Sequence, residues 1–448
     1  MLDLEAVLTP SMEHHPITAA IRRTMRLSII EGGFSQIFLL WTTGSVLIGY
    51  MHHYDASPSH LALVSSVPML AQVLSPLAAW GSSLWGKRRL LIALLAFIGR
   101  GLWFLAAIAP QLGIPNEAMP LFLILVLALS SLFQSSLGTL WTAWMGDMIP
   151  EDSRGRYIGL RSGIVGIVGM FASLASGWFL DRVAAPLNFQ LVLGVAVVSA
   201  LIAAIMIMFH YDPPPQGENL NFKELLSIPL QSQNFRRFLL FAALLHFGVF
   251  LGAPFVVPYY LDNLRMTFSQ IAFWQVIASF VSLFTTSLWG RVADKAGNKG
   301  VLTIGVFLMG LLLPLSWIMA GLLQNISVIW VSAVIDAIVW GAAGPALFNL
   351  ALASSPKENR VIYIAMYSLT IGIAGFISGT LAGPLLTWLN HYEWGRWSGY
   401  HSIFSLSSLV RLSSLIPLYY VAEVKAWRTR DLLRYMRPWR NLGFPWRQ

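Results

Sequence analysis

The chain has 448 residues, of which 56% are hydrophobic and only 11% are charged, and its formal net charge is +9. A soluble domain usually carries about 25% charged residues, so this composition excludes an ordinary soluble protein. The chain contains no cysteine, which excludes structural disulfides, thiolate metal sites and cysteine nucleophiles. The basic residues flank apolar runs, so the positive charge indicates orientation in a membrane and not binding of nucleic acid.

The apolar residues gather in runs long enough to cross a bilayer, which takes roughly 20 residues per helix. Twelve such runs are predicted, at 27–50, 59–80, 89–110, 118–146, 157–180, 188–210, 237–261, 267–289, 300–322, 326–351, 361–387 and 399–421. Backbone amides find no water in hydrocarbon, so each span must be a helix. The sequence therefore predicts an all-α integral membrane protein, and its polar start shows no cleavable signal peptide pattern.

Lysine and arginine are concentrated in every second connection between the predicted spans. The basic connections hold Arg22, Arg23, Arg26, Lys87, Arg88, Arg89, Arg154, Arg156, Arg161, Lys223, Arg236, Arg237, Arg291, Lys295, Lys299, Lys357, Arg360 and seven basic residues of the C-terminal tail. The other connections hold only Arg182, Arg265 and Arg396. The positive-inside rule therefore predicts that both termini lie in the cytoplasm.

The longest internal polar stretch divides the predicted spans into two sets of six. We expect a cytoplasmic N-terminal segment (1–26), a six-helix bundle (27–210), a cytoplasmic linker (211–236), a second six-helix bundle (237–421) and a basic cytoplasmic tail (422–448). Residues 221–230 fit a short interfacial helix or a plain linker equally well. The tail mixes basic residues with tryptophan, which favours contact with anionic lipids and leaves binding of a partner as the alternative.

The two halves repeat each other at an offset of 206 residues. Without a gap, this offset pairs Pro150 with Pro356, Arg154 with Arg360, Tyr157 with Tyr363, Gly138 with Gly344, Ser162 with Ser368, Gly169 with Gly375 and Gly177 with Gly383. A duplicated six-helix unit is typical of transporters, because rocking two halves about a site at the midplane gives alternating access. The repeat predicts two pseudo-symmetric bundles.

The connection after the eighth span carries a motif. It reads Gly290-Arg291-Val-Ala-Asp294-Lys295-Ala-Gly297-Asn-Lys299. This resembles the cytoplasmic loop signature of the major facilitator superfamily, and together with the repeat it extends the resemblance over 27–421. Its glycines allow a tight turn, and its aspartate can cap a helix N-terminus or meet a cation, so the loop is expected to latch the cytoplasmic face shut.

The family's usual copy of this motif follows the second span, and here it departs from the pattern. The loop that begins at Gly81 keeps the glycines and the basic run but lacks the aspartate, so a weaker latch is expected in the N-terminal half. Asp147 and Arg154 resemble positions that meet the signature. The fifth span also lacks the glycine-proline pair of proton-coupled drug antiporters, which argues against that activity.

Ionisable residues inside spans are costly, so each suggests a function. Asp336, in the tenth span, is a candidate for proton coupling or for binding a cationic group, and the alternative is a structural pair with an arginine. Glu31, near the cytoplasmic end of the first span, is a candidate for coupling or for a gate contact with a loop arginine. Arg100 and Arg411 lie in helices that the resemblance makes supporting ones, which favours structural ion pairs over binding of an anionic substrate.

Uncharged polar residues occur in spans that line the cavity in this family. The candidates for a substrate cavity are Gln36, Gln134, His246, Gln275, Asn349 and Trp340. For the polar five the alternative is hydrogen bonding between helices, and for the tryptophan it is packing or an interfacial anchor.

The expected function is secondary active transport of a small solute by alternating access, coupled to protons. The alternative is a transporter-like protein that moves no solute, such as a receptor or an assembly factor. No catalytic group, metal site, cofactor or ATP-binding loop is predicted, so we expect neither an enzyme nor an ATP-driven pump. We expect a monomer in a bacterial inner membrane with no nucleic-acid partner.

Overall fold

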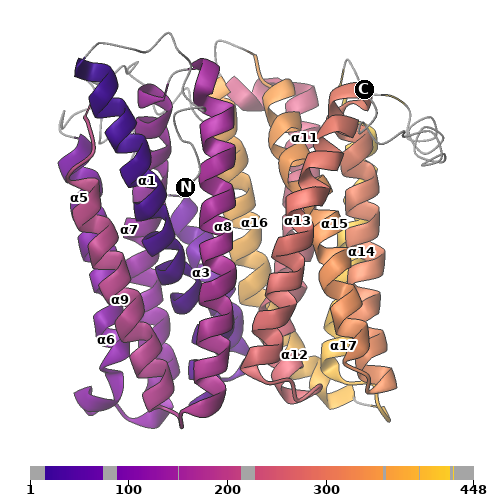
Figure 1. The fold of residues 1–448 in the computed structure, drawn as a ribbon. Coiled ribbons are helices and arrows are strands. Elements are labelled where there is room, and N and C mark those ends of the chain that lie inside the picture. Colours follow the sequence, from indigo (N-terminus) through magenta and orange to yellow (C-terminus); the bar gives the residue numbers. More distant parts are fainter. Residues whose placement is uncertain are drawn as a thin grey trace, which may run out of the picture.

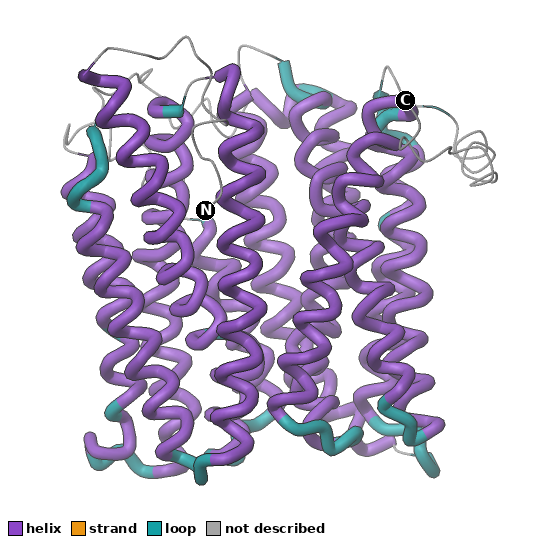
Figure 2. Tube along the Cα trace, in the orientation of Figure 1, coloured by secondary structure: helices purple, strands orange, loops and turns teal. Residues whose placement is uncertain are grey.

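The structure is a computed structural model that describes residues 16–73, 88–149, 151–212, 228–356, 360–392, 394–423 and 427. In this part of the chain the secondary structure is helical, apart from one bridge between Trp394 and Trp397. Figure 2 shows the helices running the height of the molecule, with the loops gathered at its two ends.

The N-terminal half holds α1 Pro16–Thr42, α2 Gly44–His53, α3 Pro58–Gln72, α5 Arg88–Gly101, α6 Trp103–Ala107, α7 Met119–Met148, α8 Glu151–Arg182 and α9 Leu187–Ile207. The C-terminal half holds α11 Gln233–Gly252, α12 Val256–Asp262, α13 Phe268–Ala296, α14 Asn298–Leu323, α15 Ser327–Ala353, α16 Arg360–Leu389, α17 Gly399–Ser413 and α18 Leu415–Tyr419. Short 3-10 turns lie at Ala109–Leu112, Asn116–Ala118, Ala253–Phe255 and Asn390–Tyr392.

The twelve-helix prediction is confirmed. Within the described residues, 11 helical stretches are long and apolar enough to cross a membrane, and each coincides with a predicted span. The remaining span, 59–80, begins with α3, whose residues Pro58–Gln72 are described. Predicted boundaries shift by a few residues: the sixth span was expected to reach residue 210, whereas α9 ends at Ile207.

Two spans are interrupted at related places, because the first helix of each half breaks near the same end. In the first span, α1 passes to α2 at Gly44, which has a φ of 54° that favours glycine. In the seventh span, the turn Ala253–Phe255 separates α11 from α12 and contains Pro254, which has no N–H to donate. The two halves therefore share a helix break, which the residue pairs matched at the offset of 206 do not include.

The connections define two ends of the bundle. We call the end where α1, α5 and α14 begin the basic end, and it is uppermost in Figure 1. The other, which we call the opposite end, carries the short connections 54–57, 183–186, 263–267 and 324–326. The two halves stand side by side, with α8 and α13 facing each other across the middle (Figure 1).

Matched glycines of the repeat make matched contacts between the halves. A Cβ atom added at Gly177 on α8 would lie 2.7 Å from the carbonyl oxygen of Phe268 on α13, and one added at Gly383 on α16 would lie 2.4 Å from Cα of Ser59 on α3. The fifth helix of each half thus crosses the second helix of the other half at a glycine. Because only glycine fits these contacts, the two halves pack closely there.

Each half also has an apolar core of its own. One large cluster is built from the C-terminal half around Phe238, Tyr259 and Phe404, and Ala62 is its only described member from the N-terminal half. Two smaller clusters fill the N-terminal half. The residue boundaries predicted for the two bundles stay a prediction, and much of the predicted terminal segments and linker falls outside the described residues.

Candidate functional site: a polar cavity in the N-terminal half

A cavity of ≈ 350 Å³ lies among α1, α5, α7, α8 and α9, in the half of the bundle nearer the basic end. Four residues singled out from the sequence line it: Glu31 and Gln36 on α1, Arg100 on α5 and Gln134 on α7. The structure thus brings together four candidates from three helices that are far apart in the chain.

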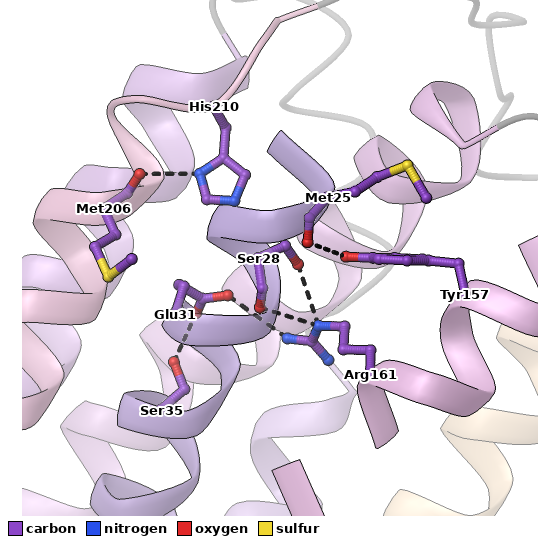
Figure 3. A network of polar contacts seen from close by, with 8 residues as sticks. All are labelled: Met25, Ser28, Glu31, Ser35, Tyr157, Arg161, Met206 and His210. Atoms are coloured by element: carbon purple, nitrogen blue, oxygen red, sulfur yellow. Dashed lines mark hydrogen bonds and ion pairs between the residues drawn. The ribbon is translucent and has the colours of Figure 1, made fainter. Parts of the chain in front are cut away.

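The main charged contact of the cavity joins Glu31 on α1 to Arg161 on α8 (Figure 3). Atom Oε2 of Glu31 lies 3.5 Å from Nη2 of Arg161, and Ser35 donates a hydrogen bond of 2.6 Å to Oε1. The glutamate is only 3% exposed. The sequence predicted a gate contact with a loop arginine as one role for Glu31, but it assigned Arg161 to a connection, whereas Arg161 lies well inside α8.

Further contacts hold Arg161 in place. Its Nε atom donates to the carbonyl and the hydroxyl oxygen of Ser28, at 3.2 and 3.1 Å, and its guanidinium lies 4.3 Å from the ring centre of Trp141. Tyr157, one turn earlier on α8, donates to the carbonyl of Met25 at 2.9 Å. These contacts, drawn in part in Figure 3, fix α8 against α1 at the basic end.

Arg100 also lines the cavity and has fewer described polar contacts than Arg161. Its guanidinium lies 5.7 Å from the ring centre of Phe38, and the side chain is 7% exposed. Its Nε and Nη1 atoms are buried without a hydrogen-bond partner. The negative charge of Glu31 acts on Arg100, but the described ion pair of Glu31 is with Arg161.

His210 follows α9 just outside the spanning segment and is drawn with the other residues of Figure 3. Its Nδ1 atom lies 2.9 Å from the carbonyl oxygen of Met206, and its ring lies 5.6 Å from that of Trp144. Burial lowers the pKa of the His210 imidazole below its usual value, because a buried site disfavours the charged form.

The second intramembrane acid lies in the C-terminal half. Asp336 on α15 is half-buried, and its charge acts on Arg411 on α17. Arg411 is 2% exposed and donates to the carbonyl of Met309 at 3.4 Å. The arrangement is compatible with either prediction made from sequence, a structural pair or a coupling site.

The remaining cavity candidates lie apart from this cavity. His246 on α11 is bonded to its own helix, with Nδ1 2.9 Å from the carbonyl oxygen of Ala242. Gln275 on α13 lines a separate small cleft between the halves. Asn349 and Trp340 on α15 are exposed.

The loop that resembles the family signature forms the predicted tight turn. Gly297 joins α13 to α14 with a φ of 86°. Glu423, and not Asp294, caps α14, because its carboxylate accepts from the backbone N–H groups of Asn298 and Lys299 at 3.0 and 2.8 Å. Asp294 is exposed, as are Arg291 and Lys295, whereas Gly290 is partly buried. Gly81 and the side chains of Asp147 and Arg154 fall outside the described residues.

Polar contacts join the two halves at the opposite end. Nε2 of His52 on α2 lies 2.6 Å from Oδ1 of Asp262 on α12, and Tyr400 on α17 donates to Oδ2 at 2.9 Å. Asp181 on α8 accepts from the backbone N–H groups of Phe268 and Ser269, both at 2.8 Å, and so caps α13. Sequence reasoning did not find these residues, although they are among the few acids outside the basic connections.

Among the described residues, no group of three or more histidines and acids is arranged to hold a metal ion.

The chain matches the family model described as Major Facilitator Superfamily over residues 32–379 and 253–447. The chain belongs to the major facilitator superfamily. The sequence resemblance is therefore confirmed, and the chain is a multi-pass membrane transporter of this superfamily.

Relatives within the superfamily are distant. The chain is 22% identical over 305 residues to the uncharacterized MFS-type transporter YybF of Bacillus subtilis, a match that covers 64% of this chain and 69% of that protein. It is 28% identical over 148 residues to the quinolone resistance protein NorA of Staphylococcus aureus, which covers 32% of this chain and 37% of NorA. The chain thus matches little more than a third of NorA.

Solved structures of the superfamily share the fold. A mutant of the nucleoside transporter NupG superposes with a TM-score of 0.71 at 13% identity, covering 89% of this chain and 100% of that one. The inward open xylose transporter XylE from E. coli superposes with a TM-score of 0.67 at 15% identity, covering 93% and 99%. At these identities the likeness shows a common fold and not a common substrate.

Proposed function

We propose that the chain is a secondary active transporter that moves a small solute by alternating access, with protons as the coupling ion. The observation that carries this proposal is the placement of a charged cavity near the basic end together with polar contacts between the halves at the opposite end. A protein of this kind exposes one central site to each side in turn.

In this proposal both termini lie in the cytoplasm, as the positive-inside rule predicts from the basic end, and the cavity near that end supports an inward-facing state. Opening to the other side requires the contacts of Asp262 and Asp181 to break. The crossings at Gly177 and Gly383 are then the surfaces on which the halves rock. In this proposal residues 27–210 and 237–421 are the moving bundles.

For proton coupling we propose Asp336, because its half-buried carboxylate acts on the buried charge of Arg411. Protonation of the acid would change the balance of charge between α15 and α17, which is how a proton can bias a two-state helix arrangement. Glu31 serves in this scheme as a gate residue that ties α1 to α8 through Arg161.

The proposal also covers the membrane, the oligomeric state and the C-terminal tail. We propose a monomer in a bacterial inner membrane, with the basic C-terminal tail on the anionic lipids of the cytoplasmic leaflet. The reaction is the movement of a solute, without enzymatic chemistry. The alternative of a transporter-like protein that moves no solute predicts a cavity without ordered polar groups, and the charged lining that includes Glu31 and Arg100 argues against it.

The proposal is tested in two stages. Purified protein is first melted in the presence of sugars, organic acids, amino compounds, peptides, lipids and drugs, because a ligand of the folded state raises the melting temperature. Uptake of any stabilising compound is then followed in proteoliposomes with an imposed pH gradient, for the wild type and for Asp336→Asn. We expect accumulation driven by the gradient in the wild type alone. Equal accumulation in both proteins would rule out Asp336 as the proton carrier, and no uptake of a bound compound would rule out transport of it.

A further inference from the structure

We infer that the cavity among α1, α5, α7 and α8 binds the carboxylate group of a small monoanionic solute, with Arg100 as the residue that anchors it. This inference rests on the proposed transport function only in naming the bound solute as the transported one. It concerns the chemistry of the bound group, which can be measured without transport.

The first argument is the charge of the lining. Arg100 and Arg161 each carry a positive charge, and Glu31 is the one acid among the described residues that line the cavity. With Glu31 ionised the lining has one uncompensated positive charge, and with Glu31 protonated it has two. A buried charge is costly unless it is paired, so the cavity favours a solute that brings a negative charge.

The second argument is that Arg100 has buried donors without a partner, whereas Arg161 is held by several contacts with the protein. Arg161 is engaged by Glu31, Ser28 and Trp141. Arg100 contacts the face of Phe38, and its Nε and Nη1 atoms are buried without a hydrogen-bond partner. A carboxylate binds along one edge of a guanidinium through two parallel hydrogen bonds, and along either edge that includes Nη2 it would pair one of the two donors that the protein leaves unpaired.

The third argument is the space beside Arg100. The cavity of ≈ 350 Å³ is at the small end of the range of about 300–1,000 Å³ that is usual for ligand sites, which suits a small molecule. Gln36 and Gln134 add uncharged donors and acceptors for the rest of the solute. Gly138 leaves room on α7, because nothing lies within 4 Å of a Cβ atom built there.

The test compares acids with their amides. Melting of the purified protein is measured with benzoate and benzamide, nicotinate and nicotinamide, and lactate and lactamide. Each pair has nearly the same shape and differs in charge. We expect at least one acid to raise the melting temperature while its amide does not. Equal protection by acid and amide, or no protection by any acid, would overturn the inference.

Three variants locate the effect. Arg100→Gln removes the charge, and Gly138→Leu fills the cavity while it keeps Arg100, so the second remains informative if the first folds poorly. Gly194→Leu is the matched control, because Gly194 on α9 also has open space within 4 Å and does not line the cavity. We expect protection by the acid to be lost in the first two variants and kept in the third. Protection that survives Gly138→Leu would overturn the inference.

The outcomes separate this inference from the proposed function. An acid that binds through Arg100 but is not moved across proteoliposomes supports the anion site and contradicts transport of that acid. A neutral or cationic solute that is transported, in a protein that no acid protects, supports transport and overturns the anion site.

Discussion

His52 and Asp262 join the two halves of the molecule at the opposite end, with 2.6 Å between Nε2 and Oδ1. His52 is the last residue but one of α2 and Asp262 is the last residue of α12, and these helices complete the first and seventh predicted spans. The ion pair therefore links the first span of one half to the first span of the other. Tyr400 donates to the same carboxylate, so Asp262 of the seventh span contacts the first and the twelfth spans.

Replacing this acid should loosen the closed end with little loss of stability. In Asp262→Ala the contacts of His52 and Tyr400 are lost, but the pair is partly exposed, with side-chain accessibilities of 47% and 37%, so the cost should stay below about 1 kcal/mol. We expect faster labelling of a cysteine at position 134 by an impermeant maleimide added from the opposite end. Glu117→Ala, at the same end, is the control. Equal labelling rates in the two variants would contradict the role of Asp262.

Glu31 and Arg161 should behave as a coupled pair. Glu31→Gln leaves the described lining of the cavity with two arginines and no acid, so we expect a loss of stability of about 3 kcal/mol, the low end of the range for removal of one partner of a buried pair. The double variant Glu31→Gln with Arg161→Gln should lose less than the sum of the single variants. Thermal or chemical unfolding in detergent measures all four proteins, and additive losses would show that the pair does not interact.

The glycine crossing between α16 and α3 should control closure. A Cβ atom at position 383 would lie 2.4 Å from Cα of Ser59, so Gly383→Ala forces the halves apart at the opposite end. We expect a cost of about 1–3 kcal/mol to the closed state and faster labelling from that end. Gly163→Ala is the control, because nothing lies within 4 Å of its added Cβ. If a cysteine at position 134 is labelled from the opposite end at the same rate with and without Gly383→Ala, this account of the crossing is contradicted.

Stability should fall in acid through His210. Burial lowers its folded-state pKa, so below about pH 6.5 the unfolded chain binds more protons than the folded one. The stabilising contribution is present above that pH and is lost as pH falls towards the folded-state pKa. His210→Phe keeps a ring beside Trp144 and removes the titration, so its melting temperature should decline less between pH 6.5 and the acid limb. Parallel pH profiles of the two proteins would exclude His210 as the cause.

Much of the fold could be predicted from the sequence because the bilayer leaves few choices. Apolar runs of spanning length must be helices, and the repeat that pairs Gly177 with Gly383 corresponds in the structure to a matched pair of helix crossings. The turn at Gly297 was also predictable, because a positive φ favours glycine.

The partners of charged residues were harder to predict, because they depend on how each helix is rotated. Arg161 was assigned to a connection by its place in a basic cluster, yet it contacts Glu31. Arg100 was expected to have an acidic partner and keeps unpaired donors. The capping of α14 by Glu423, 125 residues along the chain from Asn298, has no signal in local sequence.

Access to the cavity from both ends tests the central claim most directly. The chain has no cysteine, so Gln134→Cys provides a single thiol in the cavity. An impermeant maleimide is added from either side of the membrane, with Glu117→Cys as a marker of the opposite end. We predict labelling of position 134 from both sides, faster from the basic end. Labelling from the basic end alone, while Glu117→Cys reacts readily from the other side, would contradict alternating access.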